Sequence, residues 1–129
     1  MALTQFDGAI VAFLATAKPD RALTFYRDVL GLRLVSDDAF AFAFDVDGTQ
    51  LRIQKVESLT PQQFTALGWA VSDIENAVDR LGAAGVAFER YPFLEQDARG
   101  IWSAPSGARV AWFKDPDGNL LSLSTRGSF

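Results

Sequence analysis

The side chains that we consider as candidates for moving a proton lie close together in the second half of the chain. They are three carboxylates and a phenol between positions 89 and 97, namely Glu89, Tyr91, Glu95 and Asp97. Such groups act as general acids or bases when their surroundings tune them. Histidine and cysteine, the usual general base and thiol nucleophile, are absent from all 129 residues. Catalysis would therefore need a base from this stretch. The sequence shows no second group that would pair with any of these four side chains and activate it.

The missing residue types and the charge also limit what the chain could bind. Disulfides and thiolate metal sites are excluded, and the commonest metal ligand is lacking. The net charge is −4 and the basic residues are scattered, so no positive stripe is available to follow a phosphate backbone. We therefore expect no nucleic-acid partner.

Composition predicts one globular domain, residues 1–129, because 49% of the residues are hydrophobic and 22% are charged. No apolar run approaches the roughly 20 residues of a membrane span, so we expect no membrane partner. Residues 1–6 show no basic segment followed by an apolar one. We therefore expect no export signal and a cytoplasmic protein.

The chain repeats itself with a period of about half its length. "VAFLATAKPDRALTFYRDVLGLRL" (11–34) aligns with "ALGWAVSDIENAVDRLGAAGVAF" (66–88), and "DGTQLRIQ" (47–54) aligns with "DGNLLSLS" (117–124). Such a period is too long for a solenoid and indicates a duplicated half-domain.

Both repeats, about 8–56 and 65–125, have the pattern of a strand, a helix and three further strands. In the first helix, Pro19 suits the first turn, where its missing N–H costs nothing. In the second helix, Ser72 and Glu75 match a capping box. The pattern predicts an α+β fold of two tandem β-α-β-β-β units.

The remaining strands are predicted from alternation and turn residues. "AFAFAFDV" (39–46) alternates strictly and places Phe40 and the two phenylalanines that follow it on one face. Asp47-Gly48 then predicts a hairpin turn. In the second repeat "VAFERY" (86–91) is expected to be a strand, and an insertion covers about 92–107.

The repeated unit resembles the vicinal oxygen chelate superfamily, which includes glyoxalases, bleomycin- and fosfomycin-resistance proteins and extradiol dioxygenases. The resemblance is carried by "ALTFYRDVLGL" (22–32), "VSDIENAVDRLGAAGV" (71–86) and "FKDPDGN" (113–119), in the same order and spacing. It implies that the two units form a half-open, cup-shaped sheet, with ligands bound inside the cup and with dimers common. It does not imply a reaction, because one fold hosts many activities.

The resemblance also assigns four metal-ligand positions, which here are Val11, Arg52, Ala66 and Ser122. Metal-dependent relatives hold oxygen or imidazole ligands at such positions. Here two side chains are apolar, one is a neutral hydroxyl and one is a permanent cation. We therefore expect no metal and no cofactor in the cup, and no metal-dependent glyoxalase or dioxygenase activity.

Strand alternation predicts which polar side chains line the cup instead. Gln50, Arg52 and Gln54 share one face of their strand, and Ser122 and Ser124 share the equivalent face of theirs. Arg52 could hold a carboxylate or a phosphate with two hydrogen bonds. The alternative is that Arg52 pairs with a carboxylate of its own protein.

Two tryptophans of the second repeat have open roles. Trp102, within the insertion, could cover the mouth of the cup, or it could belong to a hairpin that packs on "RVAWF" (109–113). Trp112 could face either the cup or a dimer contact. We count Trp102 among the candidate ligand-binding residues.

Three functions agree with these observations. The first is metal-free binding of a small organic molecule in the cup, with an anionic or aromatic guest favoured over a cationic one by Arg52. The second is a metal-independent lyase or isomerase that uses a base between positions 89 and 97. The third is a non-catalytic interaction subunit. In each case we expect a homodimer, because an open cup leaves sheet edges that a second copy could cover.

Overall fold

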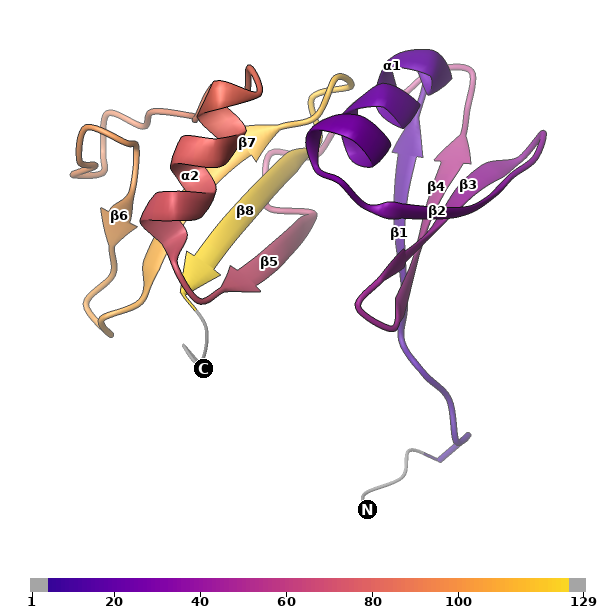
Figure 1. Ribbon diagram of the computed structural model, residues 1–129, viewed down its shortest axis with the longest axis horizontal. Coiled ribbons are helices and arrows are strands. Elements are labelled where there is room, and N and C mark those ends of the chain that lie inside the picture. Colours follow the sequence, from indigo (N-terminus) through magenta and orange to yellow (C-terminus); the bar gives the residue numbers. More distant parts are fainter. Residues whose placement is uncertain (1–4, 126–129) are drawn as a thin grey trace. The chain divides into compact units, whose positions relative to one another are not determined.

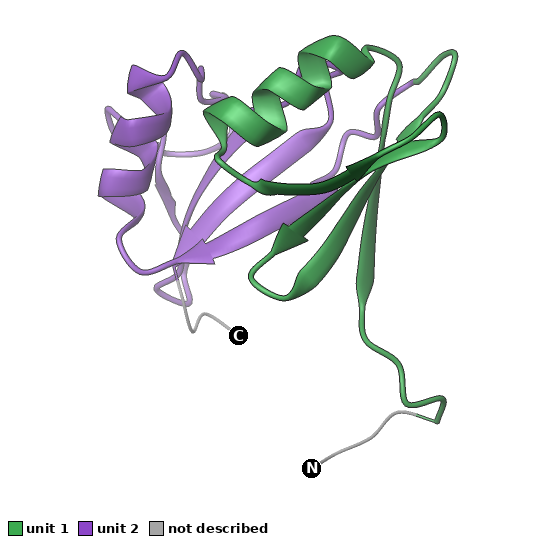
Figure 2. Ribbon diagram, turned by 45° about the vertical axis from the view of Figure 1, so that its right-hand side comes forward, with its two compact units in different colours: residues 1–59 green, residues 60–129 purple. Residues whose placement is uncertain are grey.

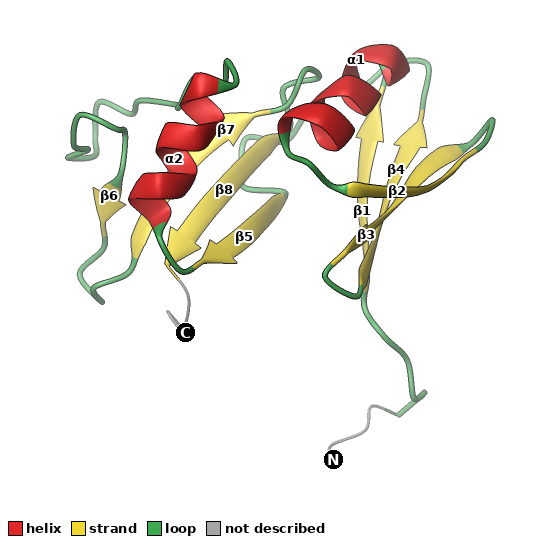
Figure 3. Ribbon diagram, in the orientation of Figure 1, coloured by secondary structure: helices red, strands yellow, loops and turns green. Residues whose placement is uncertain are grey.

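The computed structural model describes residues 5–125, and the chain divides into two compact units, residues 1–59 and 60–129 (Figure 2). Each unit holds one four-stranded mixed β-sheet and its own helical segment (Figures 1 and 3). The predicted α+β fold with two tandem β-α-β-β-β units is confirmed. No helix among the described residues is long and apolar enough to cross a membrane.

The first unit contains four strands and one helical segment. In chain order its elements are β1 (Val11–Thr16), α1 (Pro19–Leu23), the π-helix η1 (Thr24–Val29), β2 (Arg33–Asp37), β3 (Ala41–Val46) and β4 (Thr49–Lys55). The strands lie in the order β1-β4-β3-β2, with β1 parallel to β4 and the other neighbours antiparallel.

The second unit repeats this arrangement with a longer connection after its helix. Its elements are β5 (Leu67–Val71), α2 (Ile74–Ala83), β6 (Trp102–Ser103), β7 (Arg109–Lys114) and β8 (Leu120–Thr125). The strand order is β5-β8-β7-β6, and β5 is parallel to β8.

One face of each sheet is packed with apolar side chains. In the first unit Phe44 is fully buried and its ring lies 6.1 Å from that of Tyr26 on η1. In the second unit α2 packs against β7 and β8, with Ile74 and Val78 buried on its inner side. Burial of such side chains is the main source of stability in a domain of this size. The opposite face of each sheet carries the polar and exposed residues considered below.

The first helix begins at Pro19 as predicted, but it widens after one turn. Leu30 donates its backbone N–H to the carbonyl of Phe25, at 2.9 Å, which is the five-residue spacing of a π-helix. Ala22 and Tyr26 are the fully buried residues of this segment. Gly31, with φ 74°, then ends it.

The cap of α2 is Asp73 and not Ser72, so the predicted capping box is wrong. The Asp73 side chain accepts a hydrogen bond from the backbone N–H of Asn76, at 3.0 Å. Aspartate is as good a cap as serine, and it also places a negative charge at the positive end of the helix. Because Ser72 and Asp73 are both good capping residues, the sequence predicted the start of the helix only to within one position.

Phe40 does not share the buried face of β3, which corrects the predicted strand 39–46. Its side chain is 79% exposed, whereas Phe42 and Phe44 are buried. The Asp38 carboxylate accepts hydrogen bonds from the N–H groups of Phe40, at 2.8 Å, and Ala41, at 3.0 Å. These bonds shape a turn between β2 and β3, so the alternation begins only at Ala41. They also hold the pKa of Asp38 below its usual value.

The segment 86–91 is not a strand, although its sequence predicts one. Only Phe88 forms an isolated bridge, with Phe113 on β7. The edge position farther along β7 is taken by β6, which pairs Trp102 with Val110. The inserted residues therefore divide one edge strand into two short pieces. Each piece pairs with a different part of β7.

The "DPDGN" stretch forms a tight turn between β7 and β8. Asp115 is buried, and its Oδ1 accepts hydrogen bonds from the N–H groups of Asp117 and Asn119, each at 2.9 Å. Its Oδ2 accepts a third from the Asn119 side-chain amide, at 2.8 Å. Gly118 takes φ 93°, which L side chains rarely adopt. The predicted turn role of these residues is confirmed.

Candidate functional site

The uncovered face of the first sheet presents Arg52 between two strands. Arg52 pairs in register with Phe13 on β1 and with Ala43 on β3, so the three side chains share a face. Leu51 and Ile53, which point to the other face, are 2% and 1% exposed. Gln50 and Gln54, in contrast, are exposed on the same face as Arg52. The predicted alternation along β4 is therefore observed.

The uncovered face of the second sheet presents Ser122 in the equivalent place. Ser122 pairs in register with Gly68 on β5 and with Trp112 on β7. Each unit thus has a row of three residues across its first, last and third strands, and Arg52 and Ser122 occupy the same position in the two rows. Ser124 lies two residues farther along β8 and shares the face of Ser122. All of these assignments follow from the register within each unit.

Gly68 leaves room for the Ser122 hydroxyl. A Cβ built at Gly68 would collide with Oγ of Ser122. The absence of a side chain on β5 therefore lets the hydroxyl lie over the neighbouring strand. A hydroxyl in this position can both donate and accept a hydrogen bond.

Aromatic rings gather beside Ser122. The Trp112 ring lies 6.0 Å from that of Trp102 and 5.7 Å from that of Tyr91, measured between ring centroids. Trp112 Nε1 donates a hydrogen bond to Oγ1 of Thr65, at 3.2 Å, which fixes the orientation of the indole. Trp102 lies on β6 paired with β7, so the hairpin alternative is the one observed. The rings of Trp112, Trp102 and Tyr91 form a group that we call the aromatic cluster.

The sequence left open whether Trp112 faces the cup or a dimer contact, and the register of β7 against β8 places it on the face of Ser122. The signal that could have found it is the alternation along β7. Ala111 and Phe113 are fully buried, so the residue between them must point to the opposite face. The contact with Tyr91 had no such signal, because it depends on the path of the inserted segment.

Arg52 has no polar partner within residues 5–125. It is half-buried and makes neither a hydrogen bond nor an ion pair there, whereas Arg33 on the same sheet pairs with Asp45 at 2.9 Å. The charge of Arg52 does act on the carboxylate of Asp38. The pKa of Asp38 is lowered mainly by its backbone hydrogen bonds, and the charges of Arg52 and Lys55 lower it further. The internal ion pair considered for Arg52 is thus not observed among the described residues.

The four acid–base candidates are not arranged as a catalytic pair. Glu89 lies 3.6 Å from Lys114, and Asp97 accepts hydrogen bonds from the N–H groups of Arg99 and Ile101. Burial and the charge of Glu89 raise the pKa of Tyr91, which makes its phenolate rarer at neutral pH. The fourth candidate, Glu95, is exposed. The contacts of Glu89, Asp97 and Tyr91 explain these three residues as structural groups.

The inserted segment is held together by one glutamine. The Gln96 side chain accepts a hydrogen bond from the Tyr91 N–H at 2.8 Å. It donates to the carbonyls of Glu89, at 2.9 Å, and Gly100, at 2.8 Å. These bonds join the beginning of the segment to its end. They therefore fix the start of β6, where Trp102 lies.

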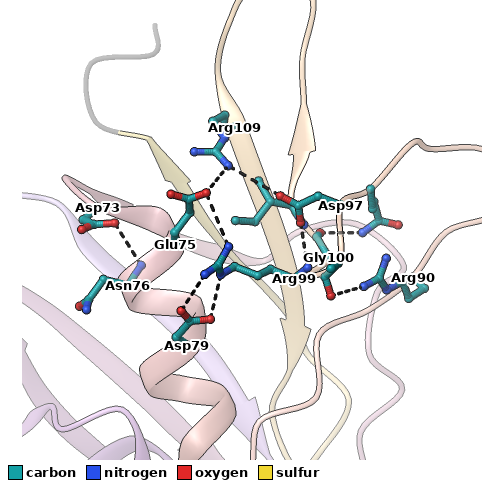
Figure 4. A network of polar contacts seen from close by, with 12 residues as sticks. Asp73, Glu75, Asn76, Asp79, Arg90, Asp97, Arg99, Gly100 and Arg109 are labelled. Carbon is teal, nitrogen blue, oxygen red and sulfur yellow. Dashed lines mark hydrogen bonds and ion pairs between the residues drawn. The ribbon is translucent and has the colours of Figure 1, made fainter.

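An ion-pair network joins the same segment to α2 (Figure 4). Arg99 donates two hydrogen bonds to Asp79, at 2.9 and 3.1 Å, and its guanidinium lies 3.7 Å from Glu75. Arg109 on β7 lies 3.3 Å from Glu75 and 3.7 Å from Asp97. The hydrogen bonds from Arg99 hold the pKa of Asp79 below its usual value, and the charge of Arg99 lowers it further. The network ties helix, strand and insertion together.

We expect Arg99→Ala to lower the Tm by about 1–3 °C, because exposed ion pairs stabilise weakly but this one closes a network. The matched control is Arg27→Ala, since Arg27 holds its neighbour Asp28 with the same two distances, 2.9 and 3.1 Å, and joins no separate elements. Differential scanning calorimetry compares the two. Equal losses would show that the network adds nothing to an isolated pair.

Comparison with known proteins identifies the family. Residues 9–123 match the model of the Glyoxalase/Bleomycin resistance protein/Dioxygenase superfamily, and the chain belongs to this superfamily. Among curated proteins, no sequence matches significantly.

Solved structures share the fold at low sequence identity. Lactoylglutathione lyase from Agrobacterium tumefaciens superposes with a TM-score of 0.72 at 20% identity, covering 94% of this chain and 95% of that one. The fosfomycin resistance protein FosX from Listeria monocytogenes gives 0.68 at 16% identity, covering 90% and 88%. A glyoxalase/bleomycin resistance protein/dioxygenase from Nocardioides gives 0.67 at 22%, covering 93% and 85%. These likenesses show the fold and leave the activity open.

The residues at the superfamily's metal positions do not fit a metal ion. Val11 and Ala66 offer no ligand atom, Ser122 offers one neutral hydroxyl, and Arg52 is a cation. Within residues 5–125, no three His, Cys, Asp or Glu side chains lie close enough together to hold a metal. The donor set therefore disagrees with the chemistry of metal-dependent relatives.

Proposed function

We propose that this protein binds a small organic molecule without a metal ion, with candidate contacts on the uncovered face of each sheet, each taken by itself. The observation that carries the proposal is Arg52, a half-buried guanidinium without a partner among the described residues. It stands at a position that metal-dependent relatives use for a ligand. A cation that is partly withdrawn from water and makes no hydrogen bond or ion pair within residues 5–125 favours an anionic guest.

The second sheet supplies a different kind of contact. The aromatic cluster offers flat apolar surface beside the hydroxyl of Ser122, and such surface gives much contact area at low entropic cost. Gln50 and Gln54 on the first sheet, and Ser124 on the second, add donors and acceptors that could orient a guest. The ligand-binding residues in this proposal are thus Arg52, Ser122, Gln50, Gln54, Ser124 and Trp102, with Trp112 added.

The proposal predicts binding that survives removal of metal. We expect a thermal-shift screen of antibiotics, aromatic acids and phosphates, run with EDTA, to give hits that raise the Tm by several degrees, because a ligand of the folded state stabilises it. Calorimetric titration of the best hit should give the same Kd with and without EDTA. A hit that binds only after Zn²⁺ or Mn²⁺ is added would contradict the metal-free proposal.

Tryptophan fluorescence can locate the aromatic contribution, because Trp69, Trp102 and Trp112 all lie in the second unit. If the best hit contacts the aromatic cluster, Trp112→Phe should remove most of the ligand-induced change in fluorescence. Trp69→Phe is the matched control, since Trp69 stacks on the buried Phe113. A signal lost only in the Trp69 variant would place the contact elsewhere.

We also propose a homodimer. The support is that β1 and β2 are edge strands of the first sheet, with exposed apolar side chains such as Val11 and Val35 on them. Multi-angle light scattering should give about twice the chain mass of 14.1 kDa at micromolar concentration. A mass equal to one chain would contradict the dimer.

A further inference from the structure

Phe13 is a large apolar residue that is exposed on the first sheet. Its side chain is 55% exposed, although it lies within β1 and beside β4. Its ring makes no contact with another aromatic ring among residues 5–125. Exposed single apolar residues are common on proteins, but this one is the register partner of Arg52. The two side chains therefore project on one face from neighbouring strands, and such strands lie about 4.8 Å apart.

The same face is hollowed on the other side of Arg52. A groove of about 510 Å³ is lined in part by Val35 on β2, Ala43 on β3 and Gln50 on β4. Ala43 is the other register partner of Arg52, and its small side chain leaves space there. Arg52 and Phe13 are not part of its lining, so the groove supplies space beside the cation and the exposed ring for a small guest.

We infer that the first sheet selects planar aryl carboxylates, with the carboxylate on Arg52 and the ring against Phe13. The inference rests on the proposed function and names the class of its ligand. A guanidinium presents two parallel N–H groups that match the two oxygens of a carboxylate. The Phe13 ring offers an aromatic partner for the guest's ring, in a stacked or edge-to-face arrangement. Gln50 and Gln54 flank Arg52 and can accept or donate hydrogen bonds at the guest's edges.

Three probes of similar size separate the contributions. Benzoate has both the ring and the charge, cyclohexanecarboxylate has only the charge, and benzamide has only the ring. We expect benzoate to bind about three- to tenfold more tightly than cyclohexanecarboxylate, from the aromatic contact. We expect it to bind at least about tenfold more tightly than benzamide, from the charge-assisted hydrogen bonds. NMR chemical-shift titration of the full-length protein measures all three.

Two variants test the assignment of the ring. Phe13→Leu keeps an apolar side chain at an exposed position, and it should reduce the preference for benzoate over cyclohexanecarboxylate to about one. Phe40→Leu is the matched control, because Phe40 is 79% exposed in the turn between β2 and β3 and does not line the groove. It should leave that preference unchanged.

Several results would overturn the inference. One is an equal Kd of benzoate and cyclohexanecarboxylate for the wild-type protein, or no binding of benzoate at millimolar concentration. Another is a preference that persists in the Phe13 variant or disappears in the Phe40 variant. If benzoate still binds better than benzamide in these cases, anion recognition by the proposed function stands and only the aryl selectivity is wrong. If the metal-free screen gives no ligand of any class, the proposed function fails as well.

Discussion

Arg52→Ala is expected to raise the Kd of the best anionic screening hit about ten- to hundredfold while leaving the Tm nearly unchanged. A hydrogen bond to a charged group contributes about 1.5–3 kcal/mol, which corresponds to this change in Kd. Stability should be retained because Arg52 pairs with no group among residues 5–125. Isothermal titration calorimetry and a thermal melt of both proteins give the two quantities.

Two further variants sharpen this experiment. Arg27→Ala is the control, because Arg27 is an exposed arginine of the same unit that already pairs with Asp28 and does not line the groove. It should leave the affinity unchanged. Arg52→Lys keeps the charge and loses the planar pair of donors, so it should give an intermediate Kd. Unchanged affinity together with a lowered Tm in the alanine variant would show that Arg52 serves the fold and not a ligand.

Asp115→Ala is expected to lower the free energy of unfolding by about 2–4 kcal/mol. The carboxylate is 6% exposed and accepts three hydrogen bonds from Asp117 and Asn119. Its removal leaves buried donors unpaired, and each such donor costs about 1–3 kcal/mol. Urea denaturation followed by circular dichroism measures the loss.

The matched control for Asp115 is Asp38→Ala. Asp38 also accepts two backbone hydrogen bonds in a turn between strands, but its carboxylate is exposed and only the N–H of Ala41 is partly buried, so water can replace the carboxylate. Asp38→Ala should therefore lower the free energy of unfolding much less than Asp115→Ala does. Asp115→Asn keeps one acceptor oxygen and should fall between the wild type and Asp115→Ala. A loss in Asp38→Ala as large as in Asp115→Ala would show that burial is not the cause.

The errors at the sequence level have a common origin. Ser72 and Asp73 are both good caps, and the choice between them depends on where α2 meets β7 and β8. Phe40 continues the alternation of β3 in sequence, but the hydrogen bonds of Asp38 begin the strand after it. The segment 86–91 has strand-forming residues, yet β6 takes part of the edge of β7. In each case local preference allowed two solutions, and tertiary contacts selected one.

The sequence by itself determined the fold, the turns and the residue types at the four positions that the resemblance assigns to metal ligands. Alternating apolar residues, the repeat and the Asp-Gly turns act over a few residues, so their consequences can be read without knowing what lies across the sheet. The exposed faces of β4 and β8 follow in the same way, since successive side chains on a strand must alternate. The residue types at Val11, Arg52, Ala66 and Ser122 need no structure to show that they cannot hold a metal.

Only the tertiary structure decided which side chains surround Arg52 and Ser122. The register of β1 against β4 places the exposed Phe13 beside Arg52, and the register of β7 against β8 places Trp112 beside Ser122. The path of the insertion brings Tyr91 and Trp102 to the same indole. These contacts join residues far apart in the chain. They depend on strand pairing and loop path, which no local pattern specifies.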